Sequence, residues 1–249
     1  MLGSILPESR QNKTTDRNNS KENLSTCHTG YDVDSYLRRA EGHSPEPIRD
    51  SVWNIIGRQV SGVVLDAGSG SGGWIKRLMQ SKSVERIISV DLVDDGAGDL
   101  EGVEFYLRDL SRDLFPCNTE ELDWVFAIEV IEHLANPRHF IAEAHRTLLP
   151  NGKLFITTPC NDSLTARLSM LFRGYYPSFC DHDYHESGHI TPITELDIKR
   201  MAEEANFRQV DFYYPLPGRI PRSSYYWQSL FPGLRGKLWS DSLFALLIK

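Results

Sequence analysis

Short apolar segments alternate with helix-like segments along the middle of the chain, and this alternation limits the fold more than any other feature. An apolar run that ends in a glycine turn and is followed by a helical pattern is typical of a βα unit. Repeated βα units build a parallel sheet with right-handed crossovers. The sequence therefore predicts an α/β fold with a doubly wound sheet. The expected strands are 63–66, 86–91, 103–107, 122–128, 153–158, 209–213 and 242–248, and the expected helices include 74–80, 139–149 and 194–205.

The composition along the chain sets the expected domain limits. Residues 1–29 are rich in Ser, Asn, Thr, Lys and Glu, and they carry too few apolar side chains to fold, so a flexible tail is expected. Residues 30–249 are expected to form one domain, which opens with two helices separated by the breaker run 42–47. Two further segments fall outside the strand and helix pattern, namely an irregular stretch, 159–192, and an insertion rich in Pro and aromatic residues, 215–240.

Charge and cysteine spacing exclude several classes of protein. The net charge of −7 argues against nucleic acid as the main partner, because phosphate binding needs a basic face. The four cysteines form no CxxC pair, which argues against a disulfide framework or a structural zinc site. No stretch has the apolar core of a signal peptide or the roughly 18 apolar residues of a membrane span. We therefore expect a cytoplasmic protein, and the sequence predicts no oligomeric state.

The strongest motif is the glycine-rich segment 66–73, which lies directly after a strand and before a helix. Glycines let the backbone turn tightly and approach a ligand, and ligands of doubly wound sheets bind at such turns. Gly68, Gly70 and Gly73 also match the GxGxxG dinucleotide pattern. However, Asp66 would repel a pyrophosphate, whereas it would attract the ammonium and sulfonium groups of S-adenosylmethionine. The charge of Asp66 therefore favours S-adenosylmethionine over NAD.

Two later strand ends also carry acids. Asp91 closes the second expected strand, where a carboxylate can accept both ribose hydroxyls. Asp109 follows the third strand, where an acid can receive the adenine amino group. The alternative is that either acid merely caps a turn. The predicted cofactor-binding residues are Asp66, Gly68, Ser69, Gly70, Gly72, Asp91, Leu92, Asp109, Leu110 and Glu129.

These motifs continue in order through 123–134, Asn136-Pro137, 148–152 and Thr157-Thr158-Pro159. Over about 63–207 the chain resembles the class I methyltransferases of the ubiquinone-biosynthesis and glycan-cluster type. It departs from them at Cys160, where these relatives often have Asn, and we expect this change to affect a local turn only. The resemblance implies a seven-stranded sheet whose last strand is inserted antiparallel.

The segment 129–133 reads Glu-x-x-Glu-His, with Glu129 at a strand end and Glu132 and His133 at the start of the next helix. Residues at i, i+3 and i+4 share a helix face, so all three are expected to converge beside the methyl group. One interpretation is a divalent metal such as Mg²⁺. The resemblance strengthens it, because metal-dependent relatives, including small-RNA 2′-O-methyltransferases, use a similar motif plus a later His, which matches His189. The resulting metal ligands would be Glu129, Glu132, His133 and His189.

Two alternatives to a metal stay open. In the first, His133 acts as a general base or orients the acceptor, together with Glu132 and His189. In the second, the segment is structural, because carboxylates in the first turn of a helix are favoured by the helix dipole. The neighbouring segment 181–186 is dense in Asp and His. We expect it to be a solvated or substrate-facing loop rather than a metal site.

The insertion 215–240 combines cations with aromatic side chains. It is interpreted as a lid over the substrate, with three alternatives: a surface that touches a membrane, a stacking platform for sugars or bases, and a dimer contact. The membrane alternative would place the protein peripherally at a membrane and would fit a lipid-linked substrate.

The sequence thus predicts an S-adenosylmethionine-dependent methyltransferase that works by in-line displacement. The acceptor is expected, chiefly through the resemblance, to be a hydroxyl of a sugar, a glycan or a small lipid-like molecule. An NAD-dependent oxidoreductase is disfavoured by Asp66 and by the lack of a Tyr-x-x-x-Lys dyad after the fourth or fifth strand. A non-catalytic nucleoside-binding module is disfavoured by the intact glycine turn and Asp91.

Overall fold

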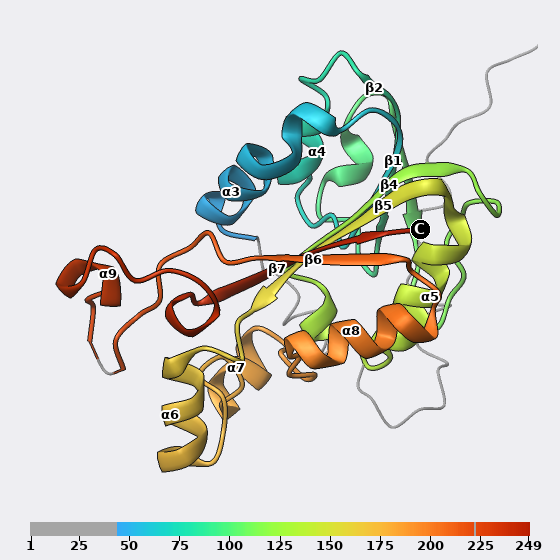
Figure 1. Ribbon diagram of the computed structural model, residues 1–249. Coiled ribbons are helices and arrows are strands. Elements are labelled where there is room, and N and C mark those ends of the chain that lie inside the picture. The colour runs from blue at the N-terminus through green and yellow to red at the C-terminus, as the bar shows by residue number, and fades with distance from the viewer. Residues whose placement is uncertain (1–43, 222) are drawn as a thin grey trace, which may run out of the picture. The chain divides into compact units, whose positions relative to one another are not determined.

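The computed structural model describes residues 44–221 and 223–249. The tail expected over 1–29 and the first of the two expected early helices lie outside the described residues. The strands form a seven-stranded sheet in the order β3-β2-β1-β4-β5-β7-β6 (Figure 1). Their bounds are β1 Gly62–Ala67, β2 Val84–Asp91, β3 Val103–Leu107, β4 Leu122–Ile128, β5 Leu148–Pro159, β6 Gln209–Tyr213 and β7 Ser242–Ile248.

The direction of the strands confirms the predicted topology. Strands β1 to β5 pair in parallel, and β7 lies antiparallel between β5 and β6. The chain moves outward from β1 to β2 and β3 on one side, and then returns to β4 on the other side of β1. This reversal opens a crevice at the carboxyl ends of β1 and β4, which is where ligands of such sheets bind.

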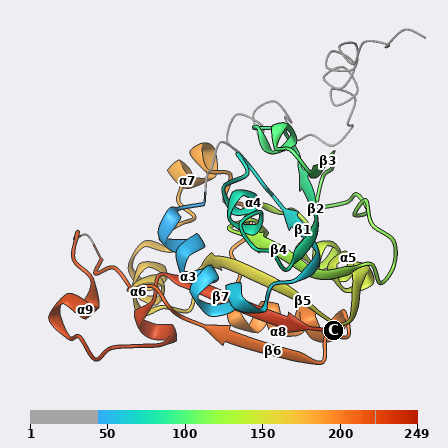
Figure 2. The same cartoon turned by 90° about the horizontal axis from the view of Figure 1, so that it is seen from above.

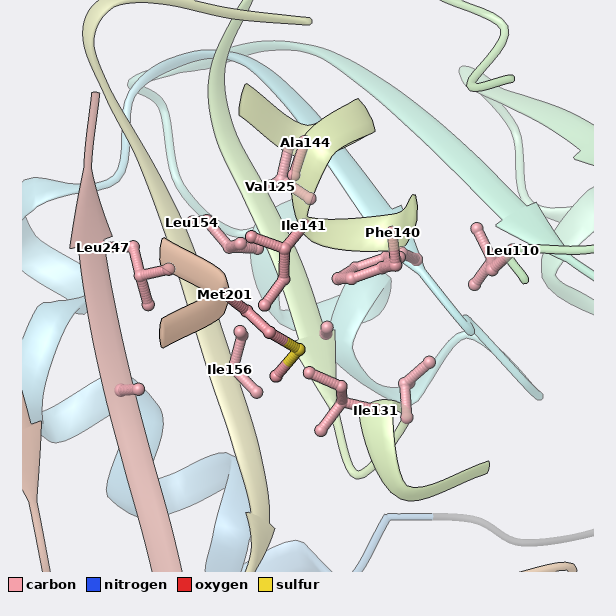
Figure 3. Packing of buried hydrophobic residues seen from close by; sticks show 14 of the residues in the cluster. Leu110, Val125, Ile131, Phe140, Ile141, Ala144, Leu154, Ile156, Met201 and Leu247 are labelled. Atoms are coloured by element: carbon pink, nitrogen blue, oxygen red, sulfur yellow. The ribbon is translucent and has the colours of Figure 1, made fainter. Parts of the chain in front are cut away.

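Helices cover both faces of the sheet (Figure 2). On one face, α3 (Glu46–Ile56) and α4 (Gly73–Leu78) bury an apolar cluster that includes Val52, Ile75 and Trp124. On the other, α5 (Pro137–Thr147) and α8 (Glu195–Glu204) pack on the central strands. Figure 3 shows Ile141 of α5 and Met201 of α8 beside Ile156 of β5. Burial of these side chains on both faces stabilises the sheet and fixes its carboxyl edge as a rigid platform.

The stretch 159–192 corrects the prediction of irregular structure, since it contains α6 (Leu164–Arg173) and α7 (Asp181–Glu186). Helix α6 has both terminal signals. The hydroxyl of Ser163 accepts from the backbone N–H of Ala166 at 3.1 Å, and Gly174 ends the helix at φ 81°. The segment 181–186 is therefore a short helix and not a loop.

Two smaller corrections concern element boundaries. Helix α3 begins at Glu46, inside the predicted breaker run, because a proline is tolerated in the first turn of a helix. Strand β5 includes the expected turn at 150–152, where Asn151 adopts a left-handed φ of 70°. The remaining short elements are the 3₁₀ turns η1 Gly57–Gln59, η2 Ala97–Asp99, η3 Ile131–His133 and η4 Lys237–Trp239.

The insertion separates β6 from β7 as predicted, and it contains η4 and the short helix α9 (Trp227–Leu230). The indole N–H of Trp227 donates to the hydroxyl of Thr165 in α6 at 3.2 Å. The same indole packs edge-on against Trp239, with ring centroids 5.5 Å apart. The first contact attaches the insertion to α6, and the second packs two parts of the insertion against each other. Within the described part of the chain, none of the helices has both the length and the apolar character needed to cross a membrane.

Candidate active site

The glycine turn after β1 has a backbone conformation and close contacts that leave little room for side chains. Gly68, Gly70 and Gly72 all have positive φ angles. A Cβ on Gly68 would lie 2.4 Å from a methyl group of Val130, so even alanine would not fit there without movement. This turn therefore presents bare backbone to the crevice, as the sequence predicts.

Asp91 holds the glycine turn against the end of β2. Its carboxylate accepts from the backbone N–H of Gly70 at 2.8 Å and from that of Leu92 at 2.6 Å. The hydroxyl of Ser89 also donates to that of Ser69 at 2.8 Å. The acid thus fixes the turn from the neighbouring strand, and its position at the strand tip is the one expected of a ribose ligand.

Asp66 lies under the turn with 2% of its surface exposed, and its Oδ2 has no hydrogen-bond partner among the described residues. Burial, together with the charge of Asp91, raises the pKa of Asp66 to about 8. Glu129 lines the same small pocket, and burial raises its pKa to about 7 even though Thr157 donates to its carboxylate at 2.8 Å. Two buried acids, one of which has a carboxyl oxygen without a hydrogen-bond partner, suit a cationic ligand. An ammonium group would donate hydrogen bonds to both acids and lower both pKa values.

Glu129 itself has a left-handed φ of 56°, a conformation that non-glycine residues rarely adopt. Its backbone N–H donates to the hydroxyl of Thr157 at 2.9 Å, and this hydroxyl donates in turn to the Glu129 carboxylate. Thr157 of β5 thus binds both the backbone N–H and the side-chain carboxylate of Glu129. Backbone strain of this kind is found at functional sites, where the surrounding structure maintains it.

A second group of buried ligand atoms follows β4. Among the described residues, Glu132, His133 and His189 each offer one ligand atom within 4.8 Å of the others. Glu132 is fully buried, and neither of its carboxylate oxygens accepts a hydrogen bond of ordinary geometry. Burial and the charge of Glu129 hold the pKa of Glu132 well above its usual range. A buried carboxyl without partners points to a ligand or substrate donor at this position.

Backbone carbonyls set the orientation of the two imidazoles. Nδ1 of His133 lies 3.2 Å from the carbonyl of Gly188, and Nδ1 of His189 lies 2.7 Å from that of Ser178. A carbonyl can only accept, so each Nδ1 carries the proton and each Nε2 carries a lone pair. Burial and the neighbouring His189 lower the pKa of His133 to about 4, which keeps this imidazole neutral at pH 7.

A larger pocket of about 790 Å³ opens beyond the end of β5. It shares a wall with the histidine pair, because the carbonyl of Ser178 both lines the pocket and accepts from His189. Its apolar lining includes Leu168, Phe172, Pro177 and Ile220, and its charged lining consists of Arg173, Arg219, Asp183 and Asp241. The pocket and the glycine turn lie at the same edge of the sheet, on either side of the residues that follow β4.

Comparison with known proteins identifies the family to which the chain belongs. The family described as "Methyltransferase domain" matches residues 36–211. The chain belongs to this methyltransferase family. The match includes the glycine turn and the Glu-x-x-Glu-His segment, and it excludes the oxidoreductase alternative. The protein is a class I S-adenosylmethionine-dependent methyltransferase, and its sheet order and inserted strand agree with this class.

Several known proteins are similar to this methyltransferase. The mitochondrial ubiquinone biosynthesis O-methyltransferase of Bos taurus is 28% identical over 187 residues, which are 67% of this chain and 50% of that protein. The chain thus spans about half the length of the bovine relative. The ubiquinone biosynthesis O-methyltransferase of Thiobacillus denitrificans is 21% identical, over 72% of this chain and 78% of its own length.

Solved structures show the same fold at lower identity. A methyltransferase from Archaeoglobus fulgidus has a TM-score of 0.57 and 18% identity, over 81% of this chain and 94% of its own. A putative methyltransferase from Haloferax volcanii, solved with the Trm112 activator, has a TM-score of 0.56 and 16% identity, over 86% of this chain and 97% of its own.

The predicted site residues of the methyltransferase fall into two groups. Asp66, Glu129 and the glycines surround the small pocket, whereas Glu132, His133 and His189 form a separate group that Glu129 does not join. The separation has a local cause, because Ile131–His133 is a 3₁₀ turn and not the start of α5, so the expected i, i+3, i+4 helix face does not exist. The proposed metal set therefore loses Glu129.

Asp109 and its neighbour have more local roles in the structure. The carboxylate of Asp109 accepts from the backbone N–H of Ser111 at 2.9 Å and pairs with Arg112 at 2.8 Å. Leu110 is buried in the core between β4 and α5. The turn-capping alternative thus describes Asp109 as it lies, and its contact with adenine stays a prediction.

Arg49 is a site residue that the sequence analysis did not single out. It lies in α3, lines the small pocket with Asp66 and Glu129, and its guanidinium lies 3.1 Å from the position of a Cβ on Gly73. It is the cation of that pocket lining, and a guanidinium suits a carboxylate. The sequence offered one signal for Arg49, because it is a basic residue near the start of the helix that precedes β1 and the glycine turn.

Proposed function

We propose that this methyltransferase transfers the methyl group of S-adenosylmethionine to a hydroxyl oxygen of a small lipid-like acceptor. The observation that carries the proposal is the large pocket with a partly apolar lining, which shares Ser178 with the histidine pair. Its aliphatic and proline side chains suit a hydrocarbon body, and its polar and charged side chains suit the hydroxyl-bearing end of the acceptor. The similarity to O-methyltransferases supports oxygen as the atom that is methylated.

The small pocket would hold the amino-acid end of the cofactor. Asp66 and Glu129 would receive its ammonium, Arg49 would pair with its carboxylate, and Asp91 would accept the ribose hydroxyls. The bare glycine turn lets the backbone approach the ligand closely. This arrangement would aim the sulfonium methyl toward the residues after β4.

In the proposed reaction, a lone pair of the acceptor oxygen attacks the methyl carbon in line with the sulfur. The C–S bond breaks, and its electron pair passes to the sulfur, which leaves neutral S-adenosylhomocysteine. Nε2 of His133 would take the hydroxyl proton, since its Nδ1 proton is held by the Gly188 carbonyl. Proximity and orientation supply most of the remaining acceleration, because the methyl group is already activated.

Glu132, His133 and His189 fit a divalent cation. The buried carboxylate of Glu132 lacks a hydrogen-bond partner, and both imidazoles donate Nδ1–H to carbonyls, as metal-bound histidines do. One carboxylate and two nitrogens favour a transition metal such as Mn²⁺ or Zn²⁺ over Mg²⁺, which prefers oxygen ligands. With such a cation bound, Nε2 of His133 would be a ligand rather than the proton acceptor, and the cation would polarise the acceptor hydroxyl and lower its pKa.

The metal proposal is tested by direct binding. We expect chelator-treated protein to bind one Mn²⁺ per chain in calorimetry, at least tenfold more tightly than it binds Mg²⁺. Glu132→Gln should weaken Mn²⁺ binding at least tenfold, because the amide lacks the negative charge. The matched control is Glu143→Gln, since Glu143 is also buried but pairs with Arg146 on α5. Absence of Mn²⁺ binding, or equal binding by Glu132→Gln, would refute a metal at this position.

The acceptor class is tested with methyl-labelled S-adenosylmethionine. We expect the label to appear in a methyl ether when the acceptor is a long-chain alkylphenol or a fatty alcohol. The rate of transfer should be at least tenfold higher than with simple glycosides. Leu168→Gln should raise KM for the lipid-like acceptors, because it places an amide in the apolar wall, while affinity for S-adenosylhomocysteine stays unchanged. Faster transfer to glycosides than to alkyl acceptors would contradict the proposal.

A further inference from the structure

Large apolar side chains are exposed on α6 and on the insertion. In α6, Leu171 is 74% exposed and Phe172 is 79% exposed, although a helix of this amphipathic kind normally turns such residues inward. On the insertion, Tyr225 is 66% exposed, and Leu230 and Phe231 are each 60% exposed. Large apolar side chains exposed close together mark a site of contact with a partner or a membrane.

The charge of these two segments differs from that of the rest of the chain. The protein carries 34 acidic residues and a net charge of −7, yet 163–180 and 212–240 contain no Asp or Glu. The same segments carry Arg173, Arg219 and Arg235, whose side chains are exposed. The apolar side chains are thus interleaved with cations alone, on a protein that is otherwise acidic.

Hydrogen bonds join the two segments. Figures 1 and 2 both place α6 and α9 beyond the ends of the same strands. The hydroxyl of Thr165 in α6 donates to the Arg219 carbonyl of the insertion, and the Trp227 indole donates to Thr165. The large pocket opens between the segments, since both Phe172 and Ile220 line it. Phe172 therefore belongs to the mouth of the pocket and to the exposed surface together.

We propose that this surface, called the docking face, binds the headgroup region of an anionic lipid bilayer. It consists of Leu171, Phe172, Tyr225, Leu230 and Phe231 with Arg173, Arg219 and Arg235. Aliphatic and aromatic tips insert at headgroup depth, and the guanidinium groups meet the negative surface potential of anionic lipids. The two segments themselves carry no acid, which reduces the repulsion that the rest of the chain would experience at such a surface, and Asp183 and Asp241 lie in the lining of the pocket between them.

The position of the pocket mouth explains what docking would achieve. On the proposed function, the acceptor is lipid-like and resides in the bilayer, so a pocket that opens within the docking face receives it without passage through water. In a two-fold dimer built on this face the same arginines of both copies would face each other, and their like charges would repel. The bilayer is therefore the partner that matches both the apolar and the charged side chains.

Vesicle sedimentation with the full chain tests the docking face. We expect binding to vesicles of phosphatidylcholine with 40 mol% phosphatidylglycerol, and at least tenfold weaker partition to pure phosphatidylcholine. Raising NaCl from roughly 50 mM to 500 mM should weaken the binding several-fold, because salt screens exposed charges. The double variants Leu171→Ser with Phe172→Ser, and Leu230→Ser with Phe231→Ser, should each lower partition at least tenfold.

The matched control is Leu114→Ser with Leu196→Ser, because these leucines are 63% and 52% exposed but lie outside the docking face. Thermal unfolding and S-adenosylhomocysteine affinity, measured on every variant, should remain unchanged. The docking proposal fails if the protein does not bind anionic vesicles, if the control lowers partition as much, or if the docking variants only abolish self-association seen by sedimentation. Vesicle binding needs no methyl transfer, so failure of the proposed acceptor class leaves this readout intact and distinguishable.

Discussion

Replacing Asp66 with asparagine is expected to stabilise the cofactor-free protein while weakening S-adenosylmethionine binding ten- to a hundredfold. Asp66 is buried, its Oδ2 lacks a hydrogen-bond partner, and its pKa is raised to about 8. A carboxylate in this position is unfavourable until a cation pairs with it, and a charge-assisted hydrogen bond to an ammonium is worth about 1.5–3 kcal/mol. Asparagine removes the cost of burying a charge in the free protein, and it also removes the charge-assisted hydrogen bond to the ammonium in the complex.

The pH dependence of stability gives this prediction a definite sign. Unfolded Asp66 has its ordinary pKa of 3.8, whereas burial raises the pKa of the folded residue to about 8. Between these values the folded state holds a proton that the unfolded state has lost, so the free energy of unfolding falls as pH rises. The expected slope from this group is about 1.4 kcal/mol per pH unit. The slope ends above pH 8, where both states are ionised.

Thermal unfolding of the wild type and Asp66→Asn, measured from pH 5 to pH 9, checks this sign. The advantage of the variant should grow up to about pH 8 and then level off. Asp211→Asn is the matched control, because Asp211 lies on β6, at the far edge of the sheet from the glycine turn. A difference in Tm that stays constant with pH would show that Asp66 is ionised in the free protein, contrary to its burial.

The raised pKa of Asp66 also predicts that protons are released when S-adenosylmethionine binds. At pH 7 the free protein holds Asp66 mostly protonated and Glu129 partly protonated, and an ammonium in the small pocket lowers both pKa values, so more than one proton should leave, the larger share from Asp66. Calorimetry in buffers of different ionisation enthalpy measures this number. Asp66→Asn should release correspondingly fewer protons, whereas Asp211→Asn should match the wild type.

Sequence reasoning succeeded where one pattern determines one element. The strands 103–107, 122–128, 209–213 and 242–248 have the predicted bounds, because buried apolar runs between polar turns leave little choice. Helix α6 was missed although Ser163 and Gly174 cap it, since its apolar residues do not follow a core-facing stripe. They are exposed to solvent, where they belong to the proposed docking face.

The site was predicted less completely, because tertiary contacts decide which side chains meet. The spacing of Glu129, Glu132 and His133 predicted one cluster, but the 3₁₀ turn and the left-handed φ of Glu129 direct them to two places. The hydrogen bonds from Thr157 that hold Glu129 come from 28 residues away in the chain. No local pattern reports such a contact. Arg49 was missed for the same reason, since only the fold brings α3 over the glycine turn.

Replacing His133 with alanine is expected to lower kcat by about 10²- to 10⁴-fold, the usual contribution of a positioned general base. Affinity for S-adenosylhomocysteine should change less than twofold, because His133 does not line the small pocket. His189→Ala should resemble it, since the two rings lie 4.8 Å apart and His189 shares a wall with the acceptor pocket. Stopped-flow or quench measurements of methyl transfer at saturating cofactor provide kcat, and calorimetry provides the affinity.

His145→Gln is the matched control, because His145 lies near the end of α5 that leads into β5, at the opposite edge of the sheet from the site. Added imidazole distinguishes chemistry from structural support. A proton acceptor lost from His133→Ala can be replaced by free imidazole, so turnover should recover in part, whereas a lost packing contact would not respond. If His133→Ala loses cofactor affinity and Tm in step with kcat and imidazole restores nothing, His133 is structural and the proton must pass to another group. The Nδ1–H bond to the Gly188 carbonyl sets the orientation of the ring, and it makes Nε2 the nitrogen that would take the proton.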